Sequence, residues 1–353
     1  MTSKLSGRFD RSVRSVLFLL SVLLFHAPLD AQTPFYKDKT IRLVAGTPAG
    51  SVYDLYARMV AQFIPKYIPG APNVIVQNMP GVASMVAANY IYTVAKPDGL
   101  TIGSIQPALY FDQLVGRKEV QFEWQKFTWI GNTTVSHHLL YMRSDTPYKT
   151  IEDIRKANVP PKCGAEGTAS SAYYLPKLLE ETIGAKFNVV LGYNSGTDVD
   201  LAVERGEVQC RAFTIAAFFA REPFNTWRKK GFVHVIVQTG KKRDAKLPEV
   251  PTLPELMDQH KTSDSAKRLA AVILAANDIG RPIIGTPAIP ADRVKILREA
   301  FMKAMKDPEL LDDAKKKKLD LDPVSGEELE SLGKEIMAQP PDVIERMKKL
   351  LGT

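Results

Sequence analysis

Residues 39–64 read KTIRLVAGTPAGSVYDLYARMVAQFI, and this stretch decides the fold class. Its first part holds a short apolar run, 41–45, which is typical of a buried strand. Further along, Leu55, Met59 and Phe63 recur on one face of a helix. A loop rich in glycine and hydroxyl residues lies between the two. The stretch therefore predicts a strand, a loop and a helix in succession.

The same order of strand and helix repeats along the chain. The pattern predicts further strands at 74–76, 101–105, 162–164, 189–192 and 208–213, and further helices at 82–90, 174–181, 199–205 and 293–306. A final helix is predicted where Ser325 and Glu328 form a capping box. Repeated β-α-β units predict an α/β fold of mainly parallel sheets flanked by helices.

The composition is that of a globular chain with about two domains. Of the 353 residues, 45% are hydrophobic and 24% are charged, which excludes a disordered or fibrous protein. Lysine and arginine number 47 against 39 acidic residues, for a net charge of +8. These cations are spread along the chain, so nucleic acid is not an expected partner. The excess suits weak attraction of small anions.

The N-terminal segment has the pattern of a secretory signal peptide. Basic residues precede an apolar run over 16–25, and the small-residue site Leu29-Asp30-Ala31 follows. We expect a signal peptide over 1–31 and a mature protein in the periplasm. The alternative is a membrane anchor, which the short run disfavours because a spanning helix needs ~20 apolar residues.

Export would place the two cysteines, Cys163 and Cys210, in an oxidising compartment. Two interpretations stay open: a disulfide, or two separate buried thiols that behave as small apolar residues. Neither the cysteines nor the histidines have the spacing of a metal site, so we expect no metal and no cofactor. His137 and His138 are expected in a strand or at its edge.

The first loop, residues 46–51, follows a strand and opens a helix. In open α/β sheets, ligands bind at the carboxyl ends of the strands, and the free N–H groups of a helix starting near Ser51 would hold a carboxylate. The loop matches neither GxGxxG nor GxxxxGK[ST], so nucleotide binding has little support. Ser51 and Asp54 fit S-x-x-D, which favours Asp54 as a helix cap instead of a ligand contact.

Two further loops, 164–171 and 193–198, also lie between strands and helices. Their hydroxyls and N–H groups suit an anion, although glycine, serine and threonine also populate ordinary turns. We expect Thr197 and Asp200 to cap the helix that follows the third loop. Loops of this kind in both halves of the chain predict a cleft between two lobes.

Several segments match a known family in order. The opening matches are 39–44, 47–51 and 54–58, followed by V-x-N-x-P-G at 76–81, A-x-P-D-G at 95–99, and shorter matches at 206–208, 250–252, 285–287 with Pro290, and 307–309. Together they resemble the tricarboxylate-transporter receptors, often called the Bug family. The likeness covers nearly all of the mature chain.

The resemblance implies a two-lobe periplasmic-binding-protein-like fold joined by two hinge strands. Lobe one would hold 32–140 and 275–353, and lobe two 141–274. It further implies a monomeric solute-binding receptor, not an enzyme, that captures a small organic acid. The partners would be the permease subunits of a tripartite tricarboxylate-type membrane transporter.

The resemblance also implies a set of ligand-binding residues. Carried over from the family, these are Thr47, Ala49, Gly50 and Ser51 in lobe one, Gly167, Thr168, Ala169, Ser170 and Ser171 in lobe two, and Tyr193, Ser195, Gly196 and Thr197 in the third loop. The chain departs from the family where Gly50-Ser51 replaces a Gly-Gly pair and Gln209 replaces an aspartate. The resemblance therefore does not name the ligand.

Charged residues near the loops bear on ligand choice. If Glu166, Asp198 or Asp200 faced the ligand, each would oppose a second carboxylate by about 4 kcal/mol at ~4 Å. Either they point away as caps, which we expect of Asp200, or the ligand is uncharged or cationic at that end. Arg281 is the cationic residue we expect at the site, with a surface or hinge ion pair as the alternative.

Two other functions share the same fold. A receptor that presents its ligand to a membrane sensor kinase would use the same lobes and the same closure. An enzyme would need a nucleophile with a base, a metal motif or paired carboxylates, and the sequence shows no such pattern.

Overall fold

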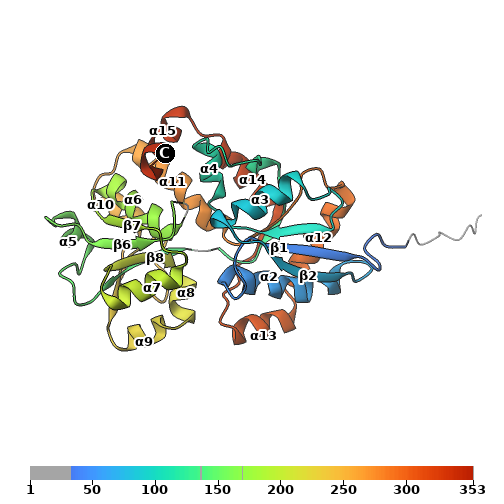
Figure 1. The fold of residues 1–353 in the computed structure, drawn as a ribbon, viewed down its shortest axis with the longest axis horizontal. Helices are drawn as coiled ribbons and strands as arrows, with labels where there is room; N and C mark the ends of the chain where they lie inside the picture. Colours follow the sequence, from blue (N-terminus) through green and yellow to red (C-terminus); the bar gives the residue numbers. More distant parts are fainter. Residues whose placement is uncertain (1–32, 136, 169, 353) are drawn as a thin grey trace, which may run out of the picture. The chain divides into compact units, whose positions relative to one another are not determined.

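The computed structural model describes residues 33–135, 137–168 and 170–352 (Figure 1). The expected signal peptide, residues 1–31, lies outside the described residues, as does Ala169 of the second loop. The described part contains a six-stranded and a five-stranded sheet. We call the six-stranded sheet with its helices lobe one and the five-stranded sheet with its helices lobe two.

The sheet of lobe one is built from β1 (Thr40–Ala45), β2 (Asn73–Asn78), β3 (Thr101–Ser104), β4 (Thr128–Asn132), β10 (Pro282–Gly285) and β11 (Val324–Ser325). In the described chain the order is β11-β4-β10-β3-β1-β2. As the β-α-β pattern predicts, β1 pairs in parallel with β2 and β3, whereas β10 and β11 pair antiparallel with their neighbours. The loops that follow β1, β2 and β3 therefore meet at one edge of the sheet.

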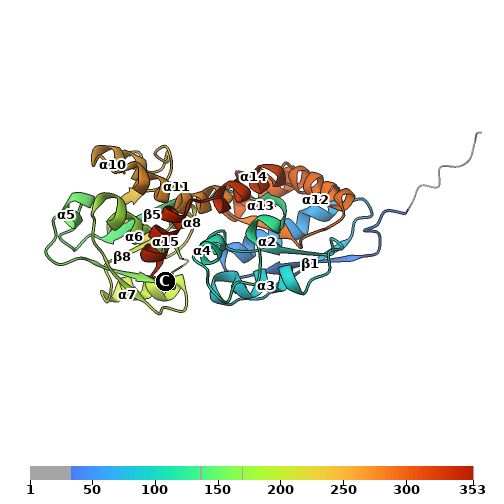
Figure 2. The same cartoon turned by 90° about the horizontal axis from the view of Figure 1, so that it is seen from above.

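Helices cover both faces of this sheet. They are α2 (Val52–Phe63), η1 (Ile64–Tyr67), η2 (Val82–Ser84), α3 (Met85–Thr93), α4 (Leu109–Leu114), η3 (Trp124–Lys126), α12 (Ala291–Ala304), α13 (Pro308–Lys316) and α14 (Gly326–Met337). α2 and α3 lie on opposite faces (Figures 1 and 2). Tyr56, Met59 and Phe63 are buried on one face of α2, so burial of an apolar stripe holds this helix to the sheet. The predicted helix at 82–90 begins as the tighter turn η2.

The sheet of lobe two is built from β5 (His138–Arg143), β6 (Lys162–Ala165), β7 (Asn188–Leu191), β8 (Cys210–Thr214) and β9 (Val233–Gln238). In the described chain the order is β7-β6-β8-β5-β9. β6 pairs in parallel with β7 and β8, and β5 pairs antiparallel with β8 and β9. The second and third loops follow β6 and β7, so they share one edge of this sheet.

The helices of lobe two are α5 (Ile151–Arg155), α6 (Ser171–Ile183), α7 (Gly196–Arg205), α8 (Ile215–Ala220), α9 (Phe224–Lys229) and α10 (Leu253–Gln259). Figure 1 shows α6 on one face of the sheet and α7 with α8 on the other. Cys163 in β6 and Cys210 in β8 form a disulfide between neighbouring strands, which decides between the two interpretations left open above. His138 lies in β5 and His137 directly before it.

The chain passes between the sheets after β4 and again after α11 (Asp264–Ile279). The two passages are joined by hydrogen bonds: the Thr133 N–H donates to the Arg281 carbonyl (3.3 Å), and the Arg281 N–H donates to the Thr134 carbonyl (3.2 Å). Arg281 is thus held at the crossing, immediately before β10. The residue bounds given above for the two lobes stay a prediction.

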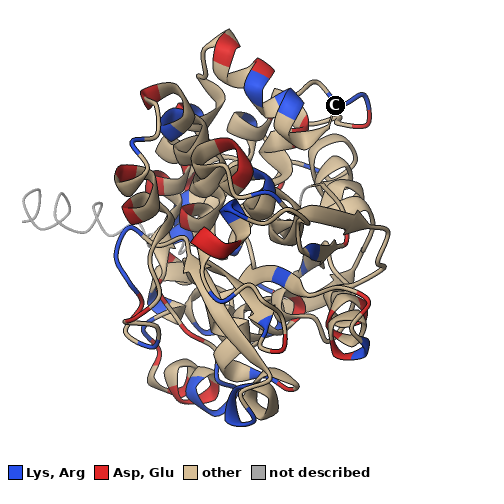
Figure 3. Cartoon of the chain, turned by 90° about the vertical axis from the view of Figure 1, so that its left-hand side faces the viewer, with Lys and Arg blue, Asp and Glu red and all other residues tan. Residues whose placement is uncertain are grey.

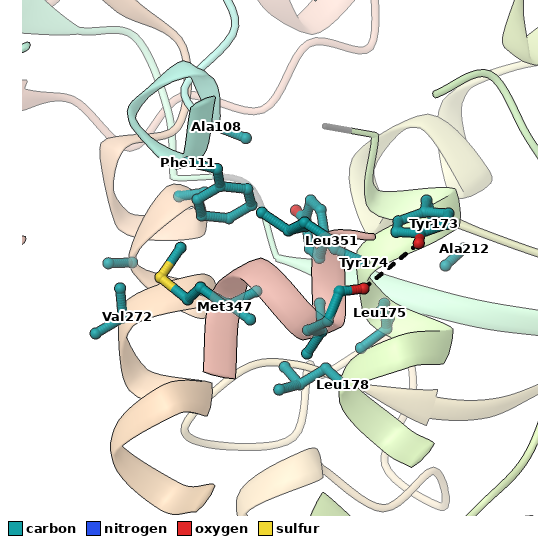
Figure 4. Packing of buried hydrophobic residues seen from close by; sticks show 14 of the residues in the cluster. Ala108, Phe111, Tyr173, Tyr174, Leu175, Leu178, Ala212, Val272, Met347 and Leu351 are labelled. Atoms are coloured by element: carbon teal, nitrogen blue, oxygen red, sulfur yellow. Dashed lines mark hydrogen bonds between the residues drawn. The ribbon is translucent and has the colours of Figure 1, made fainter. Parts of the chain in front are cut away.

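The C-terminal end differs from the expected single final helix. α14 is capped by Ser325 as predicted, but it ends at Met337, and α15 (Pro341–Leu351) follows. Two consecutive prolines, Pro340 and Pro341, explain the break, because proline stops one helix and favours the first position of the next. α15 packs against α6 and α11, and the Tyr173 hydroxyl donates to the Leu350 carbonyl (3.4 Å; Figure 4).

The buried core continues from one lobe into the other. In α4, the Phe111 ring lies edge-on to the Tyr174 ring of α6, with centroids 5.5 Å apart, and the Tyr110 hydroxyl donates to the Val272 carbonyl of α11 (2.5 Å). Figure 4 shows Phe111, Tyr174 and Met347 in one apolar cluster. α4 is therefore the part of lobe one that packs on lobe two.

The surface carries charges of both signs. On the face in Figure 3, lysines and arginines are interspersed with acidic residues and form no band of a single sign. Exposed pairs such as Lys267 with Asp258 (2.6 Å) and Arg243 with Glu255 (3.0 Å) account for part of this mixing. The sequence-based interpretation that the cations are dispersed agrees with this view.

Candidate functional site

The first loop is fixed to its surroundings by side-chain hydrogen bonds. The Ser84 hydroxyl donates to the Gly46 carbonyl (2.9 Å), and the hydroxyls of Thr47 and Ser51 lie 2.7 Å apart. The Ser51 hydroxyl also accepts from the Asp54 N–H (3.2 Å), so Ser51 caps α2. The loop is therefore preformed around the start of this helix.

The carboxylate of Asp54 accepts hydrogen bonds from three groups of the protein. These are the Gly50 N–H (2.8 Å), Arg58 Nε (2.9 Å) and Asn78 Nδ2 (2.8 Å). Burial alone would raise the pKa of Asp54, but these hydrogen bonds outweigh it and lower the pKa. Asp54 thus stabilises the loop and the start of α2, in line with the prediction that it serves the helix cap. Its carboxylate accepts from the Gly50 N–H, whereas a full capping box would use the Ser51 N–H.

Backbone donors remain open around this loop. Within the described residues, the N–H groups of Thr47 and Ala49 and of the first helical residues, Val52 and Tyr53, have no hydrogen-bond acceptor. Such groups at a helix N-terminus carry partial positive charge and attract anions. The end of α2 is therefore one half of a candidate anion site.

Arg281 is the other half. It is only 1% exposed, and its guanidinium lies 4.6 Å from the centre of the Tyr56 ring and 5.4 Å from that of Tyr53. In the described chain its Nε and Nη1 are buried without an acceptor, and no ion pair involves this residue. Burying an unpaired charge costs several kcal/mol, which a bound carboxylate would offset. Because Tyr53 belongs to the first turn of α2, its ring links Arg281 to this end of the helix.

His138 lies near Arg281 and adds no second positive charge beside it. Burial lowers the pKa of His138 to about 3, so the imidazole is neutral at physiological pH. Its Nδ1 lies 2.5 Å from Asn277 Oδ1, and its ring packs edge-on to Tyr174 with centroids 5.9 Å apart. Arg281 is therefore the charged member of this pair.

The second loop presents hydroxyls to its own backbone and to lobe one. The Ser170 hydroxyl donates to the Gly167 carbonyl (2.8 Å), and the Ser171 hydroxyl is 3.4 Å from the Ala212 carbonyl. The Thr168 hydroxyl instead accepts from Arg117 Nη2 (2.6 Å). Ser170 makes no side-chain cap to α6, so this helix also opens with free N–H groups.

The third loop differs from the prediction. Ser195, not Thr197, caps α7: its hydroxyl accepts from the Asp198 N–H (3.2 Å). Thr197 is exposed in the first turn, and Tyr193 packs beside the disulfide-bearing strand β6 near Gly164. Asp200 is therefore not a cap, which corrects the expectation, because the helix starts two residues earlier than a Thr197 cap would require.

Asp200 instead belongs to a buried ion cluster centred on Arg211. Arg211 Nη1 lies 2.7 Å from Asp200 and its Nη2 3.1 Å from Glu166, while the Tyr141 hydroxyl donates to Asp200 (2.9 Å). Burial raises the pKa of Asp200, partly offset by Arg211. Gly196 is required here, since a β-carbon at that position would collide with the Arg211 guanidinium. Glu166 and Asp200 share one guanidinium, so Arg211 offsets only part of their combined charge when both are ionised.

Sequence reasoning missed two arginines at this edge. Arg211 stands alone in an apolar strand, and a charge in such a strand needs a buried partner, so the signal was present. Arg221 directly follows α8, is exposed, and has no hydrogen-bond acceptor in the described chain. Desolvation, and after it the positive charges of Arg211 and Arg281, lower the pKa of Arg221.

The described residues contain no group of three or more histidine, cysteine, aspartate or glutamate side chains that could hold a metal ion. No helix in this part of the chain has the length and apolar character needed to cross a bilayer.

Solved structures resemble this chain over most of its length. A TctC solute-binding protein from Polaromonas superposes with a TM-score of 0.65 at 21% identity, covering 90% of this chain and 99% of that one. MatC from Rhodopseudomonas palustris with bound malate gives 0.62 at 19% identity, covering 89% and 99%. An R. palustris protein with adipate gives 0.67 at 17% identity, covering 89% and 97%. At these identities the likeness establishes the fold, and the expected two-lobe α/β fold is confirmed.

Family membership rests on the sequence. Residues 56–348 match the model of the tripartite tricarboxylate transporter family receptor, named TctC. This range takes in α2 from Tyr56 onward, the second and third loops, Arg211 and Arg281, and it starts after the first loop. The chain therefore belongs to the TctC family of tripartite tricarboxylate transporter receptors, as the resemblance predicted.

Proposed function

We propose that this protein is a periplasmic receptor that binds a small organic acid and delivers it to the permease subunits of a tripartite transporter. The observation that carries the proposal is Arg281, a buried guanidinium without an acceptor beside the N-terminus of α2. A carboxylate would accept from Arg281 and from the open N–H groups of Thr47, Ala49 and α2. The malate and adipate in two related structures support this class of ligand.

The role of the other predicted residues follows from their contacts. Gly50 and Ser51 shape the first loop, while Ser170, Ser171 and the start of α6 would contribute donors from lobe two. Because Arg211 pairs with both Glu166 and Asp200 and offsets part of their charge, we do not assign a cationic end to the ligand. Nothing in this arrangement requires chemistry on the ligand, so we propose a receptor and not an enzyme.

The direct test is binding of malate, adipate and citrate by titration calorimetry to the wild-type protein and to Arg281→Gln. Hydrogen bonds to charged groups contribute about 1.5 to 3 kcal/mol, so Arg281→Gln should weaken binding roughly 10- to 100-fold. Arg205→Gln is the matched control, because Arg205 lies exposed with its nearest acid, Glu207, 3.7 Å away. Equal affinity of Arg281→Gln and wild type would contradict the assigned anion site.

Delivery to a permease needs a separate test in cells. Deleting the gene should abolish uptake of the radiolabelled ligand identified by calorimetry, and a plasmid copy should restore it. A copy carrying Arg281→Gln should restore uptake only at high ligand concentration. Unchanged uptake in the deletion strain would argue against transport while leaving the binding assignment intact.

A further inference from the structure

Arg117 connects the two lobes at the second loop. It follows α4, the helix of lobe one whose Phe111 packs on Tyr174 of lobe two. Its Nη2 donates to the hydroxyl of Thr168 at 2.6 Å. This hydrogen bond joins a lobe-one cation to a residue that the family resemblance assigns to ligand binding.

The orientation of Arg117 is fixed from its own lobe. Its Nε lies 2.8 Å from the carboxylate of Asp112, whose side chain is only 6% exposed. The Arg117 N–H also donates to the Asp112 carbonyl (2.9 Å), which closes the turn after α4. The ion pair with this buried carboxylate restrains the guanidinium while its Nη2 donates to Thr168, although the Nε–H makes no hydrogen bond of its own within the described chain.

The hydrogen bond determines what the Thr168 hydroxyl offers to a ligand. A threonine hydroxyl has one proton and two acceptor lone pairs. When one lone pair accepts from Arg117, the hydroxyl proton is turned toward another acceptor. The neighbouring positive charge makes that hydroxyl a better donor to an anion, because charge-assisted hydrogen bonds polarise their neighbours.

We propose that Arg117 is a positioning residue of the ligand site: it holds the Thr168 hydroxyl so that its proton is directed to the ligand carboxylate. The inference rests on the proposed function, since it assumes an acidic ligand at the second loop. Because Arg117 and Thr168 belong to different lobes, this donor is complete only when α4 and the second loop are together. Closure of the lobes would thus improve the site for the anion.

A double-mutant cycle separates this role from a plain contact between lobes. The variants are Arg117→Gln, Thr168→Val and the double substitution, with malate and adipate as calorimetric probes. Each single variant should weaken binding about tenfold, and the double variant should be no weaker than Thr168→Val alone. Thr168→Ser, which keeps the hydroxyl, should bind within about twofold of wild type. Arg205→Gln serves as the arginine control.

Three results would overturn the proposal. The first is wild-type affinity in Arg117→Gln. The second is a double variant whose loss of affinity equals the product of the two single losses, since Arg117 would then act independently of Thr168. A lower melting temperature of ligand-free Arg117→Gln with unchanged affinity would show a structural contact only. If the wild-type protein binds none of the acids, the proposed function itself fails, whereas wild-type binding with an unaffected Arg117→Gln removes this inference alone.

Discussion

Replacing Arg211 by methionine tests the account of the buried ion cluster. Arg211 pairs with Asp200 at 2.7 Å and Glu166 at 3.1 Å, and the side chains of Arg211 and Asp200 are 8% and 9% exposed. Methionine has a similar length but no charge, so Asp200 would remain buried and ionised with only Tyr141 as a donor. Removing one partner of a buried pair costs about 3 to 5 kcal/mol, and Glu166, at 25% exposure, would add little because it can reach water.

The loss should depend on pH in a defined direction. Burial already holds the pKa of Asp200 above its ordinary value in the folded protein, and losing Arg211 removes the main influence that lowers it. A carboxyl whose folded pKa is raised binds its proton more readily in the folded than in the unfolded chain. Stability lost by Arg211→Met at neutral pH is therefore regained as the pH falls through the folded pKa of Asp200.

Urea denaturation at about pH 7 and about pH 5 measures both effects, with Arg205→Met as the exposed control that should lose at most about 1 kcal/mol. The double variant Arg211→Met/Asp200→Asn should recover a large part of the lost stability at neutral pH. The reasoning fails if Arg211→Met loses less than about 1 kcal/mol, or if its loss is the same at both pH values and in the Asp200→Asn background.

Two other predictions concern the same lobe. Replacing both Cys163 and Cys210 by alanine should lower the free energy of unfolding by about 4 kcal/mol, from the closure of a loop with a sequence separation of 47, and the reduced wild-type protein should match it in urea denaturation. Arg221→Gln should weaken malate binding roughly threefold to tenfold and make the affinity less dependent on salt, because an exposed cation near the site acts mainly through its long-range field. The measurement is the affinity for malate at low and at high salt. The same salt dependence in the wild-type protein and in Arg221→Gln would contradict the prediction.

The alternation of strands and helices was predictable because its signals are local. The run at 41–45 and the periodic residues of α2 lie within 25 residues of each other, and each strand and helix of the opening unit occurs where the spacing indicates. The break between α14 and α15 was missed although two prolines mark it. Helical periodicity continues on both sides, and the prolines alone do not tell where α15 will pack.

The charged part of the site could not be read from local patterns. The third loop fits two caps, Ser195 with Asp198 or Thr197 with Asp200, and the sequence does not choose between them. In the structure, the Asp200 carboxylate pairs with Arg211 of β8, and Ser195 is the residue that caps α7. Likewise the hydrogen bond from Arg117 to Thr168 joins residues 51 positions apart, and only the packing of α4 on α6 brings them together.

The two buried arginines show why burial alone does not identify a ligand contact. Arg211 has two carboxylates within 3.1 Å, so its charge is paired within the protein. Replacing it should therefore lower the free energy of unfolding. Arg281 is equally buried but has only two tyrosine rings, whose faces attract a cation without accepting its N–H groups in the plane of the guanidinium. An arginine in that state is stabilised by an added anion. Binding energy and fold stability should therefore separate cleanly: Arg211→Met lowers stability more than affinity, and Arg281→Gln lowers affinity while leaving the ligand-free protein as stable or more stable.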